Sequence, residues 1–269
     1  MRQALLILAA TAVALGVTAC GGGAGDAFSF DPVAKAATKT LHAGPSKVRL
    51  VGDVTGRGRS IHLVGGGVEA DESGDVAIFA NPFGSRRVTI HEIAVTEAGH
   101  SVIYLSVPEA TDQLPSGKKW VRVDLDKEAK KRYGVDTSQL SPTGGQNAHQ
   151  SLELLKGRGV TSRKVGTETV DGNATMHYRV VVDVPKAMKA AGASAAGMRA
   201  IHRELGDGTV PIDVWVDKSG YVHQLRMSYH LGGATVTLTE TMSDFGLPVS
   251  IKAPPPSEAI DAEKLLGSS

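Results

Sequence analysis

Few residues in this chain are spaced for catalysis or for metal binding. Cys20 is the only cysteine, and the nine histidines are scattered. His91 and Glu92 begin like a zinc-protease motif, but Val95 stands where the second histidine is required. The stretch DLDKE at residues 124–128 lacks the glycine and the final glutamate of a calcium loop. There is also no G-x-S-x-G elbow and no phosphate-binding loop, so the sequence predicts no metal, no cofactor and no enzyme.

Histidines in expected strands are the other candidates for ligands. We expect them to be surface or pleat residues, because no second ligand stands at metal-binding spacing beside them. They are His177, His223 and His230.

The chemistry of Cys20 is that of an attachment point. Arg2 precedes an apolar run of about 14 residues, Ala4 to Val17, which is shorter than the ~20 residues needed to span a bilayer. A basic start, a short apolar centre and small residues before a cut site are typical of a secretory signal. Val17-Thr18-Ala19-Cys20 resembles a bacterial lipobox, in which the cysteine becomes the acylated N-terminus. We therefore expect a signal peptide over residues 1–19, a flexible tether over 20–29 and an acyl anchor, such as palmitate, on Cys20.

The composition is that of a folded protein without a polyanionic partner. Hydrophobic residues make up 41% of the chain, charged residues 21%, and the formal net charge is +1. No basic block is dense enough for nucleic acid, so we expect no nucleic-acid partner. The 32 glycines fall mostly in short clusters, which we expect to separate strands. The mature chain of about 250 residues suits one large β domain or two small ones.

Turn-forming residues recur at the spacing of short strands. The first part of the chain predicts a helix over 34–41 after Asp31 and Pro32, followed by strands at 46–54, 60–68, 76–79, 87–95, 101–107 and 119–125. The middle predicts helices at 126–133 and 146–156, then strands at 161–170 and 175–184. The last part predicts an alanine-rich helical stretch over 185–205, interrupted at Gly192 and Gly197, and strands at 210–217, 221–230 and 234–245.

These elements predict an α+β fold with one strongly curved antiparallel sheet. The connections between strands are too short for parallel crossovers, and so many strands do not lie flat. We expect Val180 and Val182 beside Val236 and Leu238 on the face that the helices cover. No domain boundary is evident, and residues 253–269 read as a loosely ordered tail.

Three stretches carry a resemblance to a known family. They are GKKWVRVDL (117–125), VGTETVDGNATMHYRVVVDV (165–184) and VPIDVWVDKSGYVHQLRM (210–227). In this order, and together with the lipobox, they resemble actinobacterial lipoproteins of the LppX/LprG type, which are similar in fold to the periplasmic carrier LolA. The resemblance covers about residues 30–248, and it implies a lipid-binding, LolA-like half-barrel over residues 30–252.

The resemblance also implies a function and a place in the cell. It implies an extracytoplasmic lipoprotein, anchored to the outer face of the cell membrane, that carries or presents acylated lipids or glycolipids in an apolar cavity between sheet and helices. An envelope sensor with a protein partner and no lipid transfer is the alternative. The candidates for cavity-lining residues are Trp120, Leu152, Leu155, Met188, Met198, Ile201, Leu205 and Trp215. Two alternatives stay open: the tryptophans form cavity wall or plain core, and the 185–205 cover is a soft gate or an ordinary packed helix.

Overall fold

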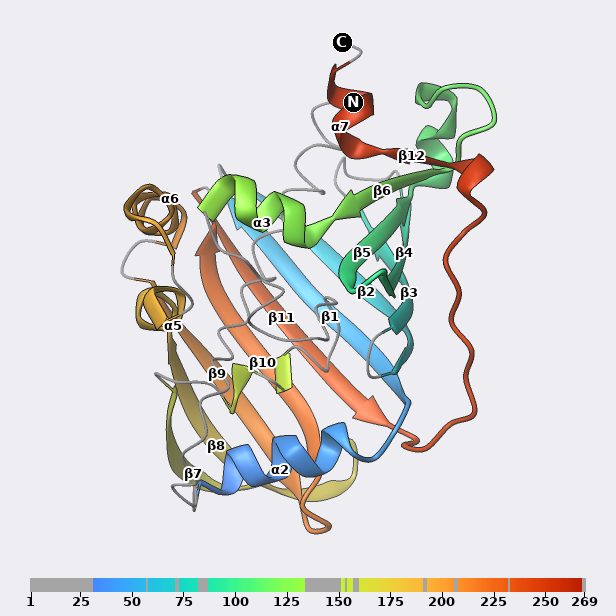
Figure 1. Ribbon diagram of the computed structural model, residues 1–269. Coiled ribbons are helices and arrows are strands. Elements are labelled where there is room, and N and C mark those ends of the chain that lie inside the picture. Colours follow the sequence, from blue (N-terminus) through green and yellow to red (C-terminus); the bar gives the residue numbers. More distant parts are fainter. Residues whose placement is uncertain are drawn as a thin grey trace.

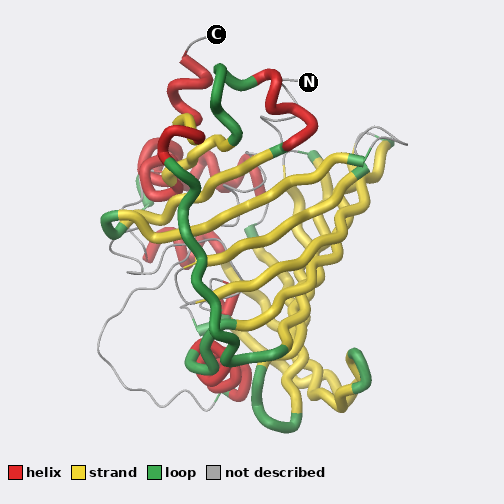
Figure 2. The backbone as a smooth tube through the Cα atoms, turned by 90° about the vertical axis from the view of Figure 1, so that its right-hand side faces the viewer, coloured by secondary structure: helices red, strands yellow, loops and turns green. Residues whose placement is uncertain are grey.

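The fold is built on a single open sheet of twelve strands, seen from the front in Figure 1 and from the side in Figure 2. This computed structural model describes residues 31–56, 58–70, 73–81, 87–133, 151–152, 154–156, 160–190, 193–205, 208–231 and 233–267. Cys20, the expected signal peptide and the expected tether lie outside the described residues.

The strands fall close to the predicted positions. They are β1 (Ser46–Gly56), β2 (Arg59–Ala70), β3 (Ser73–Ala80), β4 (Val88–Glu97), β5 (His100–Ser106), β6 (Trp120–Asp124), β7 (Val160–Val170), β8 (Asn173–Asp183), β9 (Thr209–Asp217), β10 (Val222–Leu231), β11 (Ala234–Ser243) and β12 (Ala259–Asp261). The helices are α2 (Pro32–Leu41), α3 (Leu125–Tyr133), α5 (Val184–Ala190), α6 (Ala195–Leu205) and α7 (Ala262–Gly267), with single 3-10 turns η1 (Pro108–Gln113) and η3 (Pro256–Glu258).

Two meanders meet at the centre of the sheet. The strand order is β12-β6-β5-β4-β3-β2-β1-β11-β10-β9-β8-β7, and all neighbours are antiparallel except β12 and β6. Strands β1 to β6 extend one way and β11 back to β7 the other, so that β1 pairs with β11 over ten residues. The predicted single antiparallel sheet is confirmed as one large open sheet.

The two faces of the sheet differ in what they bury. We call the face that carries Val48, Val76 and Val180 the inner face, and the opposite face the outer face. The largest core cluster lies on the inner face and includes Val180, Val182 and Val236, with Leu238 packed against it. The predicted placing of these residues on one apolar face is confirmed.

Helix α2 crosses the inner face over β9 and β10 (Figure 1). Asp31 caps its first turn by accepting a hydrogen bond from the backbone N–H of Val33 at 2.8 Å, and Pro32 supplies the fixed φ of a first helical residue. Its buried side contributes Val33, Ala36 and Ala37 to the core cluster.

Gly197 does not interrupt a helix, contrary to the prediction. The described break in the 185–205 stretch lies between α5 and α6, and Gly192 lies outside the described residues. Gly197 sits in the first turn of α6, where it is buried and its N–H donates to Ser194 Oγ at 3.0 Å. The Ser194 cap stabilises the helix start and leaves the glycine inside a continuous helix.

The C-terminal segment is ordered over its described residues, which corrects the expectation of a loose tail at 253–269. Ala259–Asp261 forms β12, which pairs in parallel with β6 and extends the sheet edge. Ala262 and Leu265 of α7 then pack against a second inner-face cluster around Ile103. Sequence reasoning missed this because a three-residue strand carries too little periodicity to detect.

Three consecutive glycines, Gly65 to Gly67, lie inside β2, within the strand predicted at 60–68. A Cβ on Gly65 would stand 2.5 Å from Ala77 O, and one on Gly67 only 1.9 Å from Asp75 O. The backbone of β3 therefore passes where a side chain would begin, and β2 requires glycine for this close approach.

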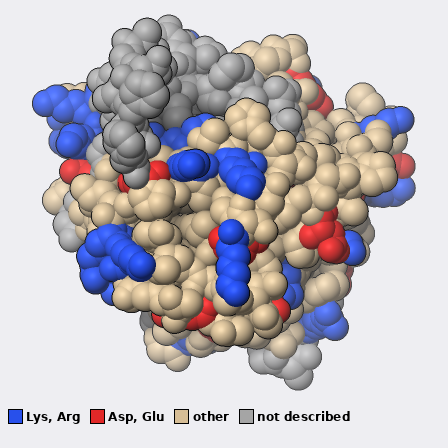
Figure 3. Space-filling view, turned by 90° about the horizontal axis from the view of Figure 1, so that it is seen from below, with Lys and Arg blue, Asp and Glu red and all other residues tan. Residues whose placement is uncertain are grey.

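The surface of the described residues carries both positive and negative side chains. Seen from below, Lys and Arg side chains are separated by Asp, Glu and uncharged residues (Figure 3). None of the helices in the described ranges has both the length and the apolar character that a bilayer crossing requires.

Candidate functional site

The middle of the inner face carries aliphatic side chains that are only half-buried. Pairing registers place them on the same side of neighbouring strands β11, β1, β2 and β3, next to the fully buried core under α2. We call them the aliphatic patch: Leu50, Val54, Ile61, Leu63, Ile78 and Leu238. Leu50, Val54, Ile78 and Leu238 pack against the inner-face core cluster and keep part of their surface open, which makes the patch a candidate binding surface.

Glycines lie among the strand residues that carry this patch. Gly52 lies between Leu238 on β11 and Leu63 on β2, and a Cβ there would stand 3.3 Å from Leu238 Cδ1 and 3.7 Å from Leu63 Cδ1. The two leucines thus lean over the bare backbone of β1. Gly65 and Gly67 on β2 also lack side chains, and we call Gly52, Gly65 and Gly67 the glycine track.

Carboxyl groups flank the glycine track on both sides. Glu240 points inward from β11, two strands from β2, and Glu92 points inward from β4, two strands from β2 on the other side. Burial among apolar neighbours raises the pKa of each carboxyl to about 7. The protonated form is therefore well populated near neutral pH, where a surface glutamate is ionised.

On the outer face, a buried histidine joins β7, β8 and β9. His177 is 6% exposed, and its Nδ1 and Nε2 each lie 2.8 Å from a carboxylate oxygen, of Glu168 and Asp213 respectively. Its ring stacks on Trp215 at 4.6 Å between centroids, and the indole Nε1–H donates to Glu168 at 2.8 Å. His177 lies in the pleat of a strand, as predicted, but it is buried and is not a surface residue.

These contacts set the acidity of the two carboxylates. Hydrogen bonds from the Trp215 indole and then His177 hold the pKa of Glu168 below its usual range. Burial is the largest single influence on Asp213 and raises its pKa, but hydrogen bonds from Arg179 and His177 outweigh it, so that the net pKa is lowered. Both carboxylates hold the His177 ring in place, and their contacts connect β8 to β7 and β9.

Both tryptophans proposed as cavity wall face away from the inner face. Trp215 alternates with the inward-facing Val214 and Val216. Trp120 packs in an outer-face cluster with Tyr104 and Ile251. Their placing on the inner side is therefore corrected. Strands β6 and β9 carry hydrophobic residues on both faces of the sheet, so the sequence alternation does not show which face is the inner one.

The other candidates divide into buried core, pocket rim and undescribed side chains. Leu152 and Leu155 are 0% and 1% exposed and belong to the inner-face core cluster. Met198 lies on α6 beside a pocket of about 420 Å³, which Arg199, His202 and Arg203 also line. The side chains of Met188, Ile201 and Leu205 lie outside the described residues.

The α6 pocket is not the expected elongated cavity. Its lining residues stand on the helical side opposite the buried Gly197 and Ala200. A second pocket, of about 460 Å³, lies by Lys47, Arg49, Asn173 and His223 under the β7–β8 turn. A cavity between the sheet and its helices thus remains a prediction.

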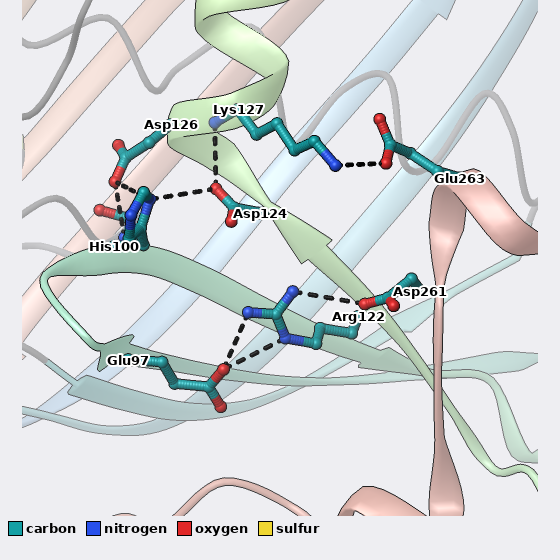
Figure 4. A network of polar contacts seen from close by, with 9 residues as sticks. Glu97, His100, Arg122, Asp124, Asp126, Lys127, Asp261 and Glu263 are labelled. Atoms are coloured by element: carbon teal, nitrogen blue, oxygen red, sulfur yellow. Dashed lines mark hydrogen bonds and ion pairs between the residues drawn. The ribbon is translucent and has the colours of Figure 1, made fainter.

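A polar network fastens the β6 edge of the sheet (Figure 4). Arg122 donates to Glu97 at 2.9 and 3.1 Å and to Asp261 of β12 at 3.3 Å. Lys127 of α3 reaches Glu263 of α7 at 2.6 Å. These contacts hold the C-terminal strand and helix to the meander.

The same network contains His100, Asp124 and Asp126, whose possible metal-ligand atoms all lie within 4.8 Å of one another (Figure 4). His100 Nδ1 lies 3.8 Å from a carboxylate oxygen of both Asp124 and Asp126. Asp124 and Asp126 accept the backbone N–H groups of Lys127 and Ser101 at 3.0 and 2.9 Å, which orders the start of α3. Sequence reasoning missed the trio because it converges only when β5 pairs with β6.

Comparison with known proteins gives distant relatives. No family model matches the chain. An uncharacterised 31.2 kDa protein of Streptomyces griseus is 26% identical over 169 residues, which are 61% of this chain and 54% of that protein. This chain thus spans about half the length of the curated relative it matches.

Two solved structures, LprF and the lipoprotein LppX, are similar at low identity. LprF from Mycobacterium bovis has 16% identity and a TM-score of 0.39, with 83% of this chain and 95% of that chain covered. LppX from Mycobacterium tuberculosis has 18% identity and a TM-score of 0.35, with 82% and 100% covered.

Proposed function

We propose that the chain is a membrane-anchored extracytoplasmic lipoprotein that binds acylated lipids on the inner face of its sheet. In this proposal helices cover the inner face, and acyl chains lie between this cover and the sheet. Cys20 carries the acyl anchor, and the glycines after it form the tether.

The aliphatic patch is the observation that carries this proposal. Its side chains lie on four neighbouring strands, so they form one continuous apolar strip rather than isolated exposed residues. Each CH₂ of an acyl chain that leaves water for such a strip contributes about 0.8 kcal/mol. Gly52, Gly65 and Gly67 lie between these side chains, at positions where neighbouring strands approach closely.

The geometry favours binding over catalysis. Glu92 and Glu240 on the inner face lie among aliphatic residues. The side chains around His177 are held by stacking and hydrogen bonds on the outer face. An envelope sensor that uses the same fold without lipid is the alternative outcome of the test below.

A matched pair of substitutions on β2 tests the proposal. Leu63 points into the aliphatic patch, whereas its neighbour Val64 points outward and is 44% exposed. We expect acyl lipids to co-purify with the wild-type chain and with Val64→Asp, and to be strongly reduced in Leu63→Asp, because a carboxylate on the patch raises the cost of burying acyl chains. Lipid mass spectrometry on equal amounts of folded protein gives the measurement.

Two results would contradict the proposal. One is a wild-type chain that carries no lipid when purified from its own membranes. The other is an equal lipid content in both variants, which would place bound lipid away from the patch and favour the sensor.

A further inference from the structure

The inner face is acidic where it is polar. Four adjacent cross-strand rows run from β11 or β1 to β4 on this face, and their positions contain three carboxyl groups and no lysine or arginine. The three carboxyls are those of Glu69, Glu92 and Glu240. A lipid with a phosphate or carboxylate head would meet repulsion here.

Glu240 is the most enclosed of the groups that flank the glycine track. It is 3% exposed, and its cross-strand partners are Leu50 and Leu225. Within the described ranges its carboxyl makes no hydrogen bond or ion pair with another residue. Buried polar groups are nearly always hydrogen-bonded, so a group left open in this way points to a ligand.

Glu92 lies on the other side of the track and is half-buried. It lies between Val76 and Leu105 in the neighbouring row, again with no side-chain partner among the described residues. The two carboxyls therefore border the floor formed by Gly65 and Gly67.

We propose that Glu240 binds the hydroxyl group of an amphiphile whose hydrocarbon part lies on the aliphatic patch, with Glu92 as a second hydroxyl-binding position. The inference rests on the proposed function and names the class of lipid: one with a free hydroxyl near its chains. A carboxylic acid donates one hydrogen bond and accepts others, which matches a hydroxyl group in both directions.

The surroundings select a hydroxyl over a charged head group. Burial raises the pKa of both carboxyls to about 7, so that the neutral acid is present at neutral pH. An ammonium head would have to form an ion pair among leucines, where desolvation of both charges opposes binding. A hydroxyl group loses less hydration and gains the hydrogen bond that Glu240 lacks.

A competition between two probes tests this. The intact acylated chain is incubated with equal amounts of 1-octadecanol and 1-methoxyoctadecane, and native mass spectrometry measures the ratio of the two bound forms. The ether keeps the hydrocarbon chain and the oxygen but cannot donate. We expect the alcohol-to-ether ratio to be roughly tenfold higher for the wild type than for Glu240→Leu, which is the range of one buried hydrogen bond.

Control variants separate recognition from folding. Glu240→Gln still offers a donor and an acceptor and should keep most of the preference. Asp53→Leu removes a carboxylate from the outer face of β1 and should change nothing. Removing an unpaired buried carboxyl does not lower stability, so Glu240→Leu should unfold at an unchanged or higher denaturant concentration.

The possible outcomes have distinct meanings. If the wild type binds neither probe, the proposed function fails. If it binds both, but the ratio is the same in the wild type, Glu240→Leu and Glu92→Leu, lipid binding stands and the hydroxyl-binding role is refuted.

Discussion

Adding one methyl group at Gly67 should destabilise the sheet. A Cβ at this position would lie 1.9 Å from Asp75 O and 2.8 Å from Val76 Cα, both backbone atoms of β3. Ordinary van der Waals contact begins near 3.4 Å, so that the oxygen is about 1.5 Å too close. No rotamer change relieves this, because backbone stands on the other side.

The magnitude follows from the cost of overpacking. Forcing a methyl group into packed structure costs about 1–3 kcal/mol, and the upper end applies where backbone must shift. At this size of protein, 1 kcal/mol lowers Tm by about 2–4 °C, so we expect Gly67→Ala to lower Tm by about 6–12 °C. Urea unfolding followed by circular dichroism measures the same loss as a lower midpoint.

Gly166→Ala is the matched control for this prediction. Gly166 also lies in a strand, but a Cβ there meets nothing within 4 Å and its φ needs no glycine. This substitution should leave stability unchanged or raise it by about 0.4–1 kcal/mol. Equal effects of the two substitutions would show that β2 is not held at β3 by this close approach.

Three further substitutions test other parts of the molecule. Cys20→Ala should abolish metabolic labelling with a fatty acid, and labelling that persists would refute the lipobox. Because burial raises the pKa of Glu240 from 4.5 to about 7, the folded state binds its proton more tightly, and stability falls as pH rises through this window by ~3 kcal/mol at most. Glu240→Gln should remove that share of the fall between about pH 5 and pH 8 in urea titrations, whereas an unchanged slope would show that the carboxyl is not buried in solution. Leu265→Ala should cost about 1–2 kcal/mol if α7 is docked as described, and no loss would mean that the helix is free.

The positions of most strands along the chain were predictable, because turn residues bound them. Asp171 and Gly172 form the β7–β8 turn, and Gly220 the β9–β10 turn, all with positive φ that glycine or aspartate tolerates. Local chemistry of this kind is visible in the sequence. Pairing of β1 with β11 was not, since it joins residues almost two hundred positions apart by registers that no local pattern encodes.

Which residues form the candidate site was predictable only in part. Helical spacing put Leu152 and Leu155 on one side, and the structure buries both in the inner-face core cluster, while their lining of a cavity remains a prediction. For Trp120 and Trp215 the sequence left cavity wall and plain core open, and the structure places both on the outer face, because their strands bury residues on both faces. The aliphatic patch was missed because its residues are ordinary strand residues until β11, β1, β2 and β3 are placed side by side.

The division of work between the two faces is the main argument for a binding function. On the outer face, the polar groups that could do chemistry are already engaged: His177 with two carboxylates, and Trp215 with the histidine ring and Glu168. On the inner face, by contrast, the described aliphatic patch is half open and the carboxyl of Glu240 has no partner among the described side chains. A sheet that satisfies its polar groups on one side and leaves apolar surface with a few hydrogen-bonding groups on the other is suited to holding a largely hydrocarbon ligand. The position of the glycine track, between Glu92 and Glu240, then sets where the polar part of that ligand would lie.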